Sequence, residues 1–316
     1  MKRCVAPMSR TGSVSRVSPR VEPAYAADAS VFSVTEELTM GLRFAGIADP
    51  RRIATDIIAA LLEVPRSWPA MNRESALDPG VLRSAREAAR QLGAGAPFAY
   101  AVGSAQFRHL NLAVDSRVLI PRPETEVLVG EVLDRMEAQF GEESWGTAID
   151  IGTGSGAIAL SLASEGRFDR VVATDVSVDA LDVARINATR SAAALSCSVE
   201  FLTGSLLAPV RGLKATALVS NPPYIAFAEL DNLPPSVREW EPPLALASGH
   251  DGMAATAGIV AGGTRILVSG GLLALEVDER RASMVAELVM GNGGYTRVGV
   301  RLDLAGRERF VFASRI

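Results

Sequence analysis

The run Ser220-Asn221-Pro222-Pro223-Tyr224 combines residue types that suit a planar –NH2 group. Two consecutive prolines stiffen the chain and remove two N–H donors, so that nearby carbonyl groups remain as acceptors. Asn221 adds a side-chain oxygen acceptor, and Tyr224 adds an aromatic face. We therefore expect Asn221, Pro222, Pro223 and Tyr224 to bind the substrate. Asn221, Pro222 and Tyr224 are the predicted catalytic residues.

The chemistry that this cluster supports is alkylation of a nitrogen. An amide nitrogen is a poor nucleophile because its lone pair is delocalised into the carbonyl group. Acceptors that hold both N–H bonds orient the nitrogen, and they bind it more strongly as positive charge develops during attack on a methyl sulfonium. Orientation of the reactants can contribute about 7–11 kcal/mol more. The alternative interpretation is a proline-rich turn that ends a strand and binds nothing.

A glycine-rich turn, Gly152-Thr153-Gly154-Ser155-Gly156, follows the apolar run Ala148–Ile151 and precedes a helical pattern. Glycine lets the backbone turn sharply and lets a ligand approach the N–H groups at a helix N-terminus. Asp175 ends the next apolar run about 20 residues later, where an acid accepts hydrogen bonds from a ribose diol. These six residues are predicted to bind a nucleoside cofactor. The alternative is a tight turn without a ligand, with Asp175 as a helix N-cap.

Two classes of nucleoside cofactor use such a turn, nicotinamide dinucleotides and S-adenosylmethionine. The dinucleotide fingerprint is Gly-x-Gly-x-x-Gly. In this chain Gly156 already stands two residues after Gly154, and Ala157 follows it. The spacing therefore favours S-adenosylmethionine without excluding a dinucleotide.

Asn221-Pro222-Pro223-Tyr224 downstream of the glycine turn resembles the amino-directed methyltransferases that use S-adenosylmethionine. Within that group, the run Leu119-Ile120-Pro121-Arg122-Pro123-Glu124-Thr125-Glu126 resembles the HemK/PrmC family, the peptide chain release factor glutamine methyltransferases. Further stretches that match the family are Phe98-Ala99-Tyr100, Gly103, Phe107, Ala173-Thr174-Asp175-Val176-Ser177, Glu241-Pro242, Ala245-Leu246, Asp251-Gly252, Gly270-Gly271 and Glu276. The resemblance runs from about Ile47 to the C-terminus.

The resemblance implies a fold, a reaction and a partner. The implied fold is α/β, a Rossmann-like class I methyltransferase sheet with a small N-terminal helical domain and a β-hairpin linker. The implied reaction is methyl transfer from S-adenosyl-L-methionine to the Gly-Gly-Gln glutamine of class 1 release factors, which yields N5-methylglutamine. The glycine turn and Asp175 would bind the cofactor, with Asn221 near the methyl group. The family usually places an acid and then a bulky residue near the adenine, where this chain has Ser205 and Leu206. We expect Leu206 to contact the adenine, with altered affinity.

Four segments are expected along the chain: a disordered tail over 1–30, a helical substrate-binding domain over 31–95, a hairpin linker over 96–121 and a methyltransferase domain over 122–316. Asp49-Pro50 and Asp78-Pro79 each place a capping residue before a proline at a helix start, and Gly93 supplies a stop.

Periodicity predicts the elements of the last two segments. Alternation from Phe107 to Val114 predicts the hairpin, and Pro123 to Phe140 reads as a helix. Short continuous apolar runs predict buried parallel strands. These runs are Ala148–Ile151, Val171–Ala173, Ala217–Val219 and Leu272–Val277.

Composition narrows the class of protein. The chain has 316 residues and a net charge of −4, and no apolar run approaches the roughly 18 residues of a membrane span. Cys4 and Cys197 are too few for a disulfide framework or a zinc site, so we expect no metal and a reducing cytoplasm. Basic residues gather in the first twenty positions, before any acid, so the remaining chain is more acidic than the total suggests. That balance disfavours nucleic acid as a partner and favours a basic protein. The tail could instead be an organelle transit peptide. We expect a monomer.

For several charged residues, both a catalytic and a structural role are open. Glu124 and Glu126 could orient groups near the sulfonium or complement the dipole at a helix start. Glu276 at a strand end is more often structural than catalytic. The two histidines, His109 and His250, share no motif, so a histidine-based mechanism is not expected.

Three other functions stay open at this point. The same tetrapeptide accepts exocyclic amines of RNA or DNA bases, and sister enzymes methylate a glutamine of a ribosomal protein. A catalytically silent protein that binds S-adenosylmethionine is the third, although such a protein would be free to lose Asn221 and Tyr224.

Overall fold

A computed structural model describes residues 29–316 of the chain. The tail expected over residues 1–30 therefore lies almost entirely outside the described residues. Ser30 begins the first helix, because its Oγ accepts the Ser33 N–H at 3.2 Å and so satisfies one of the free donors at the helix start.

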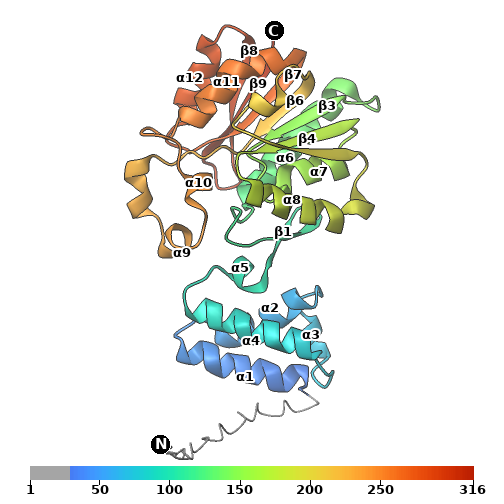
Figure 1. Cartoon of the computed structure of the whole chain (residues 1–316), viewed down its shortest axis with the longest axis vertical. Helices are drawn as coiled ribbons and strands as arrows, with labels where there is room; N and C mark the ends of the chain where they lie inside the picture. Colours follow the sequence, from blue (N-terminus) through green and yellow to red (C-terminus); the bar gives the residue numbers. More distant parts are fainter. Residues whose placement is uncertain (1–28) are drawn as a thin grey trace, which may run out of the picture.

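Four helices near the N-terminus form an apolar core of their own at one end of the molecule (Figure 1). They are α1 Val31–Phe44, α2 Pro50–Leu61, α3 Trp68–Met71 and α4 Pro79–Gly93. Apolar residues recur at helical spacing on their buried faces, and helices of this length depend on such packing for stability.

Both aspartate–proline pairs begin a helix as predicted, but only one aspartate caps its helix. Asp78 Oδ1 accepts the Gly80 N–H at 2.6 Å. The cap predicted at Asp49 is wrong: its backbone is left-handed, with φ 50°, and its side chain lies 3.6 Å from Arg52 instead. Helix α4 ends at Gly93 as predicted, although the left-handed residue that follows it is Gly95, with φ 94°.

The segment after α4 is only partly the hairpin predicted from the sequence. Strands β1 Ser104–Phe107 and β2 Leu110–Ala113 pair antiparallel, which confirms the alternation. The residues before them form a short helix, α5 Phe98–Val102, which begins after Pro97. Tyr100 on α5 donates its hydroxyl to the Val118 carbonyl at 2.5 Å, so α5 is fixed to the chain that leads into the sheet domain.

Seven strands form one sheet in the order β5-β4-β3-β6-β7-β9-β8. The first five in that order are parallel, and β9 runs antiparallel to both of its neighbours. The strands are β3 Thr147–Ile151, β4 Arg170–Asp175, β5 Ser198–Thr203, β6 Ala215–Ser220, β7 Leu267–Glu276, β8 Tyr295–Leu302 and β9 Glu308–Arg315. The predicted α/β sheet is therefore confirmed.

Helices cover both faces of the sheet and bury separate apolar clusters (Figure 1). Helices α6 Pro123–Phe140 and α7 Ala157–Glu165 pack on one face, and α8 Val178–Arg190 packs beside α7 against β4 and β5. Helices α11 Ala254–Ile266 and α12 Ala282–Gly291 pack on the other face. Short continuous apolar strands are what this burial on both faces requires.

Three strands, β5, β8 and β9, were not among the predicted apolar runs. Strand β5 lies at the edge of the sheet and has mostly half-buried or exposed side chains, so it lacks a continuous apolar run. Strand β8 lies at the other edge with a similar pattern. Shorter helices complete the chain: η1 Ala192–Ala194, η2 Ala208–Val210, η3 Phe227–Asn232, α9 Pro235–Arg238 and α10 Pro243–Leu246. The last three form an excursion between β6 and α11 that stands beside the sheet (Figure 1).

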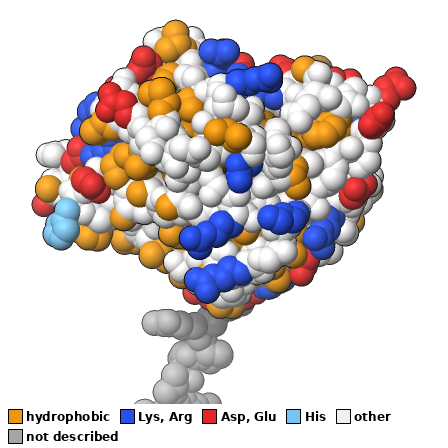
Figure 2. All heavy atoms as spheres, turned by 90° about the horizontal axis from the view of Figure 1, so that it is seen from above, with side chains coloured by type: hydrophobic (Ala, Val, Ile, Leu, Met, Phe, Trp, Pro, Cys, Tyr) orange, Lys and Arg blue, Asp and Glu red, His pale blue; other side chains and the backbone are white. Residues whose placement is uncertain are grey.

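The surface carries mixed charge. Figure 2 shows several basic side chains across the lower half of the face seen from above and others near its upper edge, with acidic ones mainly toward the outline. Within residues 29–316, no helix has the length and apolar character needed to cross a membrane.

Candidate active site

The carboxyl ends of four parallel strands bring the predicted site residues to one edge of the sheet. The glycine turn follows β3, Asp175 ends β4, Leu206 follows β5 and Asn221 follows β6. Parallel strands end at the same edge, which is where open α/β sheets bind ligands. Residues from all four segments line one cavity of about 590 Å³, hereafter the larger cavity.

The glycines of the turn differ in what surrounds them. Gly152 and Gly154 have φ values of 72° and 54°, and a Cβ at either position would meet nothing within 4 Å. Both line the larger cavity, so their backbone is open to a ligand. Gly156, with φ 86°, is packed: a Cβ there would lie 3.1 Å from Leu160 and 3.3 Å from Ala184. The third glycine therefore serves the packing of α7 against α8.

Thr153 and Ser155 do not line the larger cavity but tie the turn to its surroundings. Thr153 Oγ1 donates to Asp150 Oδ2 at 2.6 Å, and burial raises the pKa of that carboxyl to about 7. The Ser155 carbonyl accepts from Asn187 Nδ2 at 2.8 Å. These two positions shape the turn from behind.

Asp175 lines the larger cavity with both carboxylate oxygens already oriented. Oδ2 accepts the Gly154 N–H and Oδ1 accepts the Ser177 N–H, each at 2.9 Å. Helix α8 is capped by Ser177, whose Oγ accepts the Ala180 N–H at 3.1 Å, so the alternative of Asp175 as N-cap is wrong. A carboxylate oxygen retains a free lone pair after one such bond and can still accept from a diol.

Ser205 and Leu206 also line the larger cavity. Leu206 adopts a left-handed backbone with φ 49°, which is rare for a residue with a branched side chain. Its side chain sits where a Cβ on Gly258 would be only 2.6 Å from Leu206 Cδ1. The glycine in α11 thus makes room for an apolar wall of the cavity.

Asn221 and Pro222 lie between the larger cavity and a second one of about 430 Å³, hereafter the smaller cavity. Both residues line both cavities. Pro223 lines only the larger cavity, and Tyr224 lines only the smaller one. Leu119 and Ala245 line both cavities as well, so a group bound in each cavity would meet the other across a wall formed by Asn221, Pro222, Leu119 and Ala245.

The wall offers two free acceptors. Asn221 Nδ2 donates to Thr125 Oγ1 at 3.1 Å. Within residues 29–316, neither Asn221 Oδ1 nor the Pro222 carbonyl accepts a hydrogen bond. Burial raises the pKa of Tyr224 to about 12, so its phenol stays neutral at physiological pH. The arrangement presents two acceptors and an aromatic face, as the sequence predicts.

Asp251-Gly252 supports Tyr224 from behind. Gly252 has φ 75°, and a Cβ there would lie 2.3 Å from the Tyr224 carbonyl oxygen. Arg281 Nε donates to the Asp251 carbonyl at 2.8 Å and fixes this pair of residues. Only glycine fits at position 252.

The family-like run before α6 lies beside the smaller cavity, which Leu119 and Arg122 line. Arg122 Nη2 donates to Glu241 Oε1 at 2.6 Å, and the Glu241 side chain is only 1% exposed. Two stretches far apart in the sequence thus meet as an ion pair, and its arginine lines this cavity.

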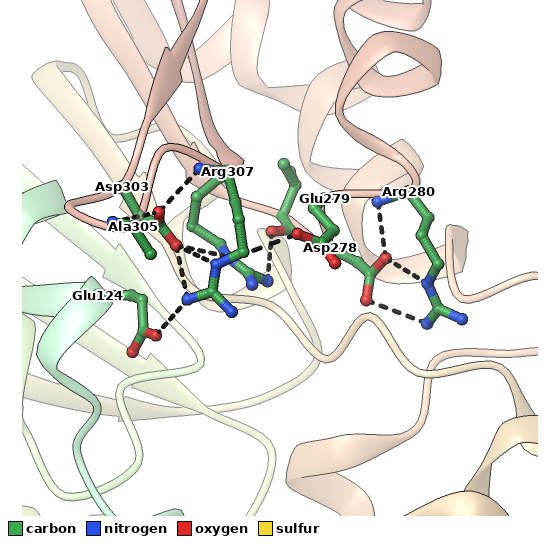
Figure 3. A network of polar contacts seen from close by, with 9 residues as sticks. Glu124, Asp278, Glu279, Arg280, Asp303, Ala305 and Arg307 are labelled. Carbon is green, nitrogen blue, oxygen red and sulfur yellow. Dashed lines mark hydrogen bonds and ion pairs between the residues drawn. The ribbon is translucent and has the colours of Figure 1, made fainter.

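Further charged residues connect α6, the β8–β9 turn and the segment after β7, which Arg307 reaches through Glu279 at 4.0 Å (Figure 3). Arg307 on the β8–β9 turn contacts Glu124 of α6 at 3.0 Å and Asp303 at 2.8 Å. Arg280, after β7, contacts Asp278 at 2.8 Å, and both line the cavity. Glu124 lines neither cavity, which favours its interpretation as a residue of the helix start.

Thr125, which hydrogen-bonds Asn221, lies between Glu124 and Glu126 in the sequence. Thr125 lies on the buried face of α6, which continues at Leu128 and Val129. Its hydroxyl accepts from Asn221 and donates to Glu276 Oε2 at 2.7 Å. The helical spacing of Thr125 with those apolar residues is a sequence signal that it lies on the buried face of α6, but this spacing does not point to Asn221 as its partner.

Glu276 is buried at the end of β7, with a residue exposure of 1%. Burial raises the pKa of its carboxyl to about 7, against the opposing effects of the Thr125 hydrogen bond and of Arg309. Buried carboxyls with raised pKa values cluster at functional sites.

Comparison with known proteins identifies relatives of this chain. Residues 35–103 match the family described as PrmC N-terminal domain, and residues 127–232 match the Methyltransferase small domain. Release factor glutamine methyltransferase of Moorella thermoacetica is 41% identical over 88% of this chain and 96% of its own length. The Rhodopirellula baltica protein of that name is 40% identical over 72% of this chain and 76% of its own.

The Bacillus cereus protein of the same name is 35% identical, over 81% of this chain and 90% of its own length. Among solved structures, a methyltransferase from Pyrococcus furiosus is 18% identical with a TM-score of 0.47, over 66% of this chain and 91% of that one.

Proposed function

We propose, because the chain belongs to the release factor glutamine methyltransferase family, that it methylates the glutamine of the Gly-Gly-Gln motif in class 1 release factors. The proposed donor is S-adenosyl-L-methionine, and the proposed product carries the methyl group on the side-chain amide nitrogen.

The observation that carries this proposal is the wall between the two cavities. A methyl donor in the larger cavity and an amide in the smaller cavity would both contact Asn221 and Pro222. Methyl transfer needs the nitrogen and the methyl carbon in line at close approach, and two cavities that share lining residues permit that approach.

The larger cavity fits S-adenosylmethionine in its donors and acceptors. Asp175 would accept hydrogen bonds from the ribose hydroxyls, and the open backbone of Gly152 and Gly154 would face the amino acid part of the cofactor. Leu206 gives an apolar surface for the adenine. The bound cofactor supplies an electrophilic methyl group.

The chain's own residues act on the acceptor amide. Asn221 Oδ1 and the Pro222 carbonyl would accept its two N–H bonds, which turns the nitrogen toward the larger cavity. These bonds strengthen as the nitrogen becomes positive, so they stabilise the transition state more than the ground state. Tyr224 remains a neutral phenol and packs on the amide plane. The methylated nitrogen is strongly acidic and releases its proton to solvent water, so no dedicated base is needed.

We also propose roles for the segments. Residues 31–95 form a substrate-binding domain that holds the release factor, 96–121 form the linker, and 122–316 form the transfer domain. The protein would act as a monomer in the cytoplasm on a protein partner.

The test offers the full-length protein several acceptors in parallel. Isotopically labelled S-adenosylmethionine is supplied with a purified class 1 release factor, with ribosomal proteins, with tRNA and rRNA, and with DNA. The nucleic-acid samples are needed because several basic side chains lie across part of the face shown in Figure 2. A release factor whose Gly-Gly-Gln glutamine is replaced by glutamate is the matched control.

We expect label on the release factor alone, mapped by mass spectrometry to the motif glutamine, and none on the control. Label on nucleic acid or on a ribosomal protein, with none on the motif glutamine, would overturn the proposal. Cofactor binding without transfer to any acceptor would indicate a silent binding protein.

A further inference from the structure

A buried chain of hydrogen bonds connects the wall to a carboxyl that touches neither cavity. Asn221 Nδ2 donates to Thr125 Oγ1 at 3.1 Å, and Thr125 Oγ1 donates to Glu276 Oε2 at 2.7 Å. Thr125 is 5% exposed and Glu276 is 1% exposed. The three residues come from the end of β6, the first turn of α6 and the end of β7. Strands β6 and β7 are neighbours, with Ser220 beside Leu275, so the next residue of each lies at the same edge.

The number of protons in this chain fixes its direction. A hydroxyl group has one hydrogen to donate, and an ionised carboxylate can only accept. Thr125 therefore gives its hydrogen to Glu276, and its oxygen can then only accept. The Asn221 amide must place its –NH2 group toward Thr125, which turns Oδ1 away from it.

This orientation decides what the substrate meets. An amide of the substrate brings two N–H donors to the wall, so it needs an acceptor on Asn221. If the Asn221 amide were flipped, its –NH2 group would face the –NH2 group of the substrate, and neither could accept. Among the described residues, the bond to Thr125 is the one hydrogen bond that distinguishes the two ends of this side chain.

We propose that Thr125 and Glu276 are positioning residues that hold the Asn221 amide with its oxygen toward the substrate. The effect on methyl transfer rests on the proposed function, whereas the orientation of the Asn221 amide does not. Neither residue lines either cavity, and Thr125 reaches the wall through its hydrogen bond to Asn221, so an effect of changing Thr125 on transfer would pass through Asn221. Glu276 also acts electrostatically on Tyr224, so Thr125 is the position that isolates the effect on Asn221.

The orientation of the Asn221 amide depends on the ionisation of Glu276. The charged groups that face it are Arg309 on β9, Arg122 before α6 and Glu124 on α6, and Tyr224 is also close enough to feel its charge. When Glu276 is protonated it becomes a donor to Thr125, whose own hydrogen is then free to bond Asn221 Oδ1. Both orientations of the Asn221 amide are then allowed, so the selection fails as the pH falls through the pKa of Glu276.

The first measurement needs no substrate. The side-chain 15N–1H resonances of Asn221, identified by their loss in Asn221→Ala, report directly on the bond to Thr125. We expect them to shift in Thr125→Val, which removes the hydroxyl at nearly constant volume, and to stay in place in Thr125→Ser. In the wild type they should titrate near pH 7, and Glu276→Gln should abolish that titration.

The second measurement is the single-turnover rate of methyl transfer to a release factor. Thr125→Val should lower it about tenfold, the effect of one orienting hydrogen bond, with cofactor affinity and KM for the release factor nearly unchanged. Thr125→Ser should transfer at close to the wild-type rate. If Thr125→Val fails to fold, Glu276→Gln carries the test through the loss of pH dependence.

The outcomes separate this inference from the proposed function. Unchanged Asn221 resonances and an unchanged rate in Thr125→Val would overturn the positioning role, as would an equal loss in Thr125→Ser. Shifted resonances in a wild-type protein that never methylates a release factor would retain the hydrogen-bond chain and overturn the proposed function instead.

Discussion

Replacing Gly252 by alanine is expected to slow methyl transfer about 10²-fold, through a displacement of Tyr224. A Cβ at position 252 lies 2.3 Å from the Tyr224 carbonyl oxygen, whereas ordinary contacts begin at 3.4 Å, so the backbone must move by about 1 Å. The neighbouring Arg281 Nε, at 2.9 Å from the same Cβ, blocks escape on another side. A shift of about 1 Å in a residue that positions a reactant costs about 10²-fold in rate.

The matched control is Gly212→Ala. Gly212 has φ 85°, but a Cβ there would meet nothing within 4 Å, so it shares the backbone strain without the collision. That strain is about 1–2 kcal/mol for a left-handed residue with a side chain. Both variants should therefore lose thermal stability, and only Gly252→Ala should lose transfer rate.

Single-turnover kinetics with a release factor measure the rate, calorimetry measures Tm, and titration calorimetry measures the Kd of S-adenosylmethionine. Because Gly252 does not line the larger cavity, the Kd should stay near the wild-type value. Equal transfer rates in the two variants would refute the claim that this contact positions Tyr224. A parallel loss of cofactor affinity would place the effect in the larger cavity and also contradict the reasoning.

Three further predictions follow from the same geometry. Asn221→Ala should abolish transfer while leaving Tm close to the wild-type value, which near-normal turnover would contradict. Glu276 has its pKa raised from 4.5 to about 7 on folding, so the folded state binds more protons than the unfolded state between these values. Its contribution to the free energy of unfolding is therefore lost as the pH rises toward 7, and Glu276→Gln should show a smaller decrease in Tm from pH 5 to pH 7.5. Gly258→Ala should push Leu206, 2.6 Å away, into the larger cavity and weaken S-adenosylmethionine binding several-fold at an unchanged saturated rate. Gly291→Ala, in open space on another helix, is its control.

The sequence was sufficient to predict the part of the site that is built from residues adjacent to strands. The glycine turn, Asp175 and Asn221 each follow a short apolar run, and the rule that parallel strands end at one edge places them together. This rule alone is enough to predict that these residues lie close together in the structure. Strand β5 escaped prediction because an edge strand buries less apolar surface.

The partners of those residues could not be predicted from the sequence. Thr125 and Asn221 are separated by 96 positions, and Thr125 and Glu276 by 151, so no local pattern relates them. Glu124 and Glu126 stood out because charged groups at a helix start have several chemical uses. The threonine between them bears a less reactive group, and only the direction of its side chain makes it important.

The wall between the cavities also limits where selectivity can arise. Asn221, Pro222 and Tyr224 would contact only the amide of the acceptor, and every glutamine carries the same amide. Selection of one glutamine in one protein must therefore depend on surfaces beyond the wall. The ion pair of Arg122 with Glu241 and the charged network at Arg307 fix the position of such surfaces around the smaller cavity (Figure 3). Under the proposed function, the wall accounts for the reaction, whereas the surrounding residues and the N-terminal helices account for the choice of substrate.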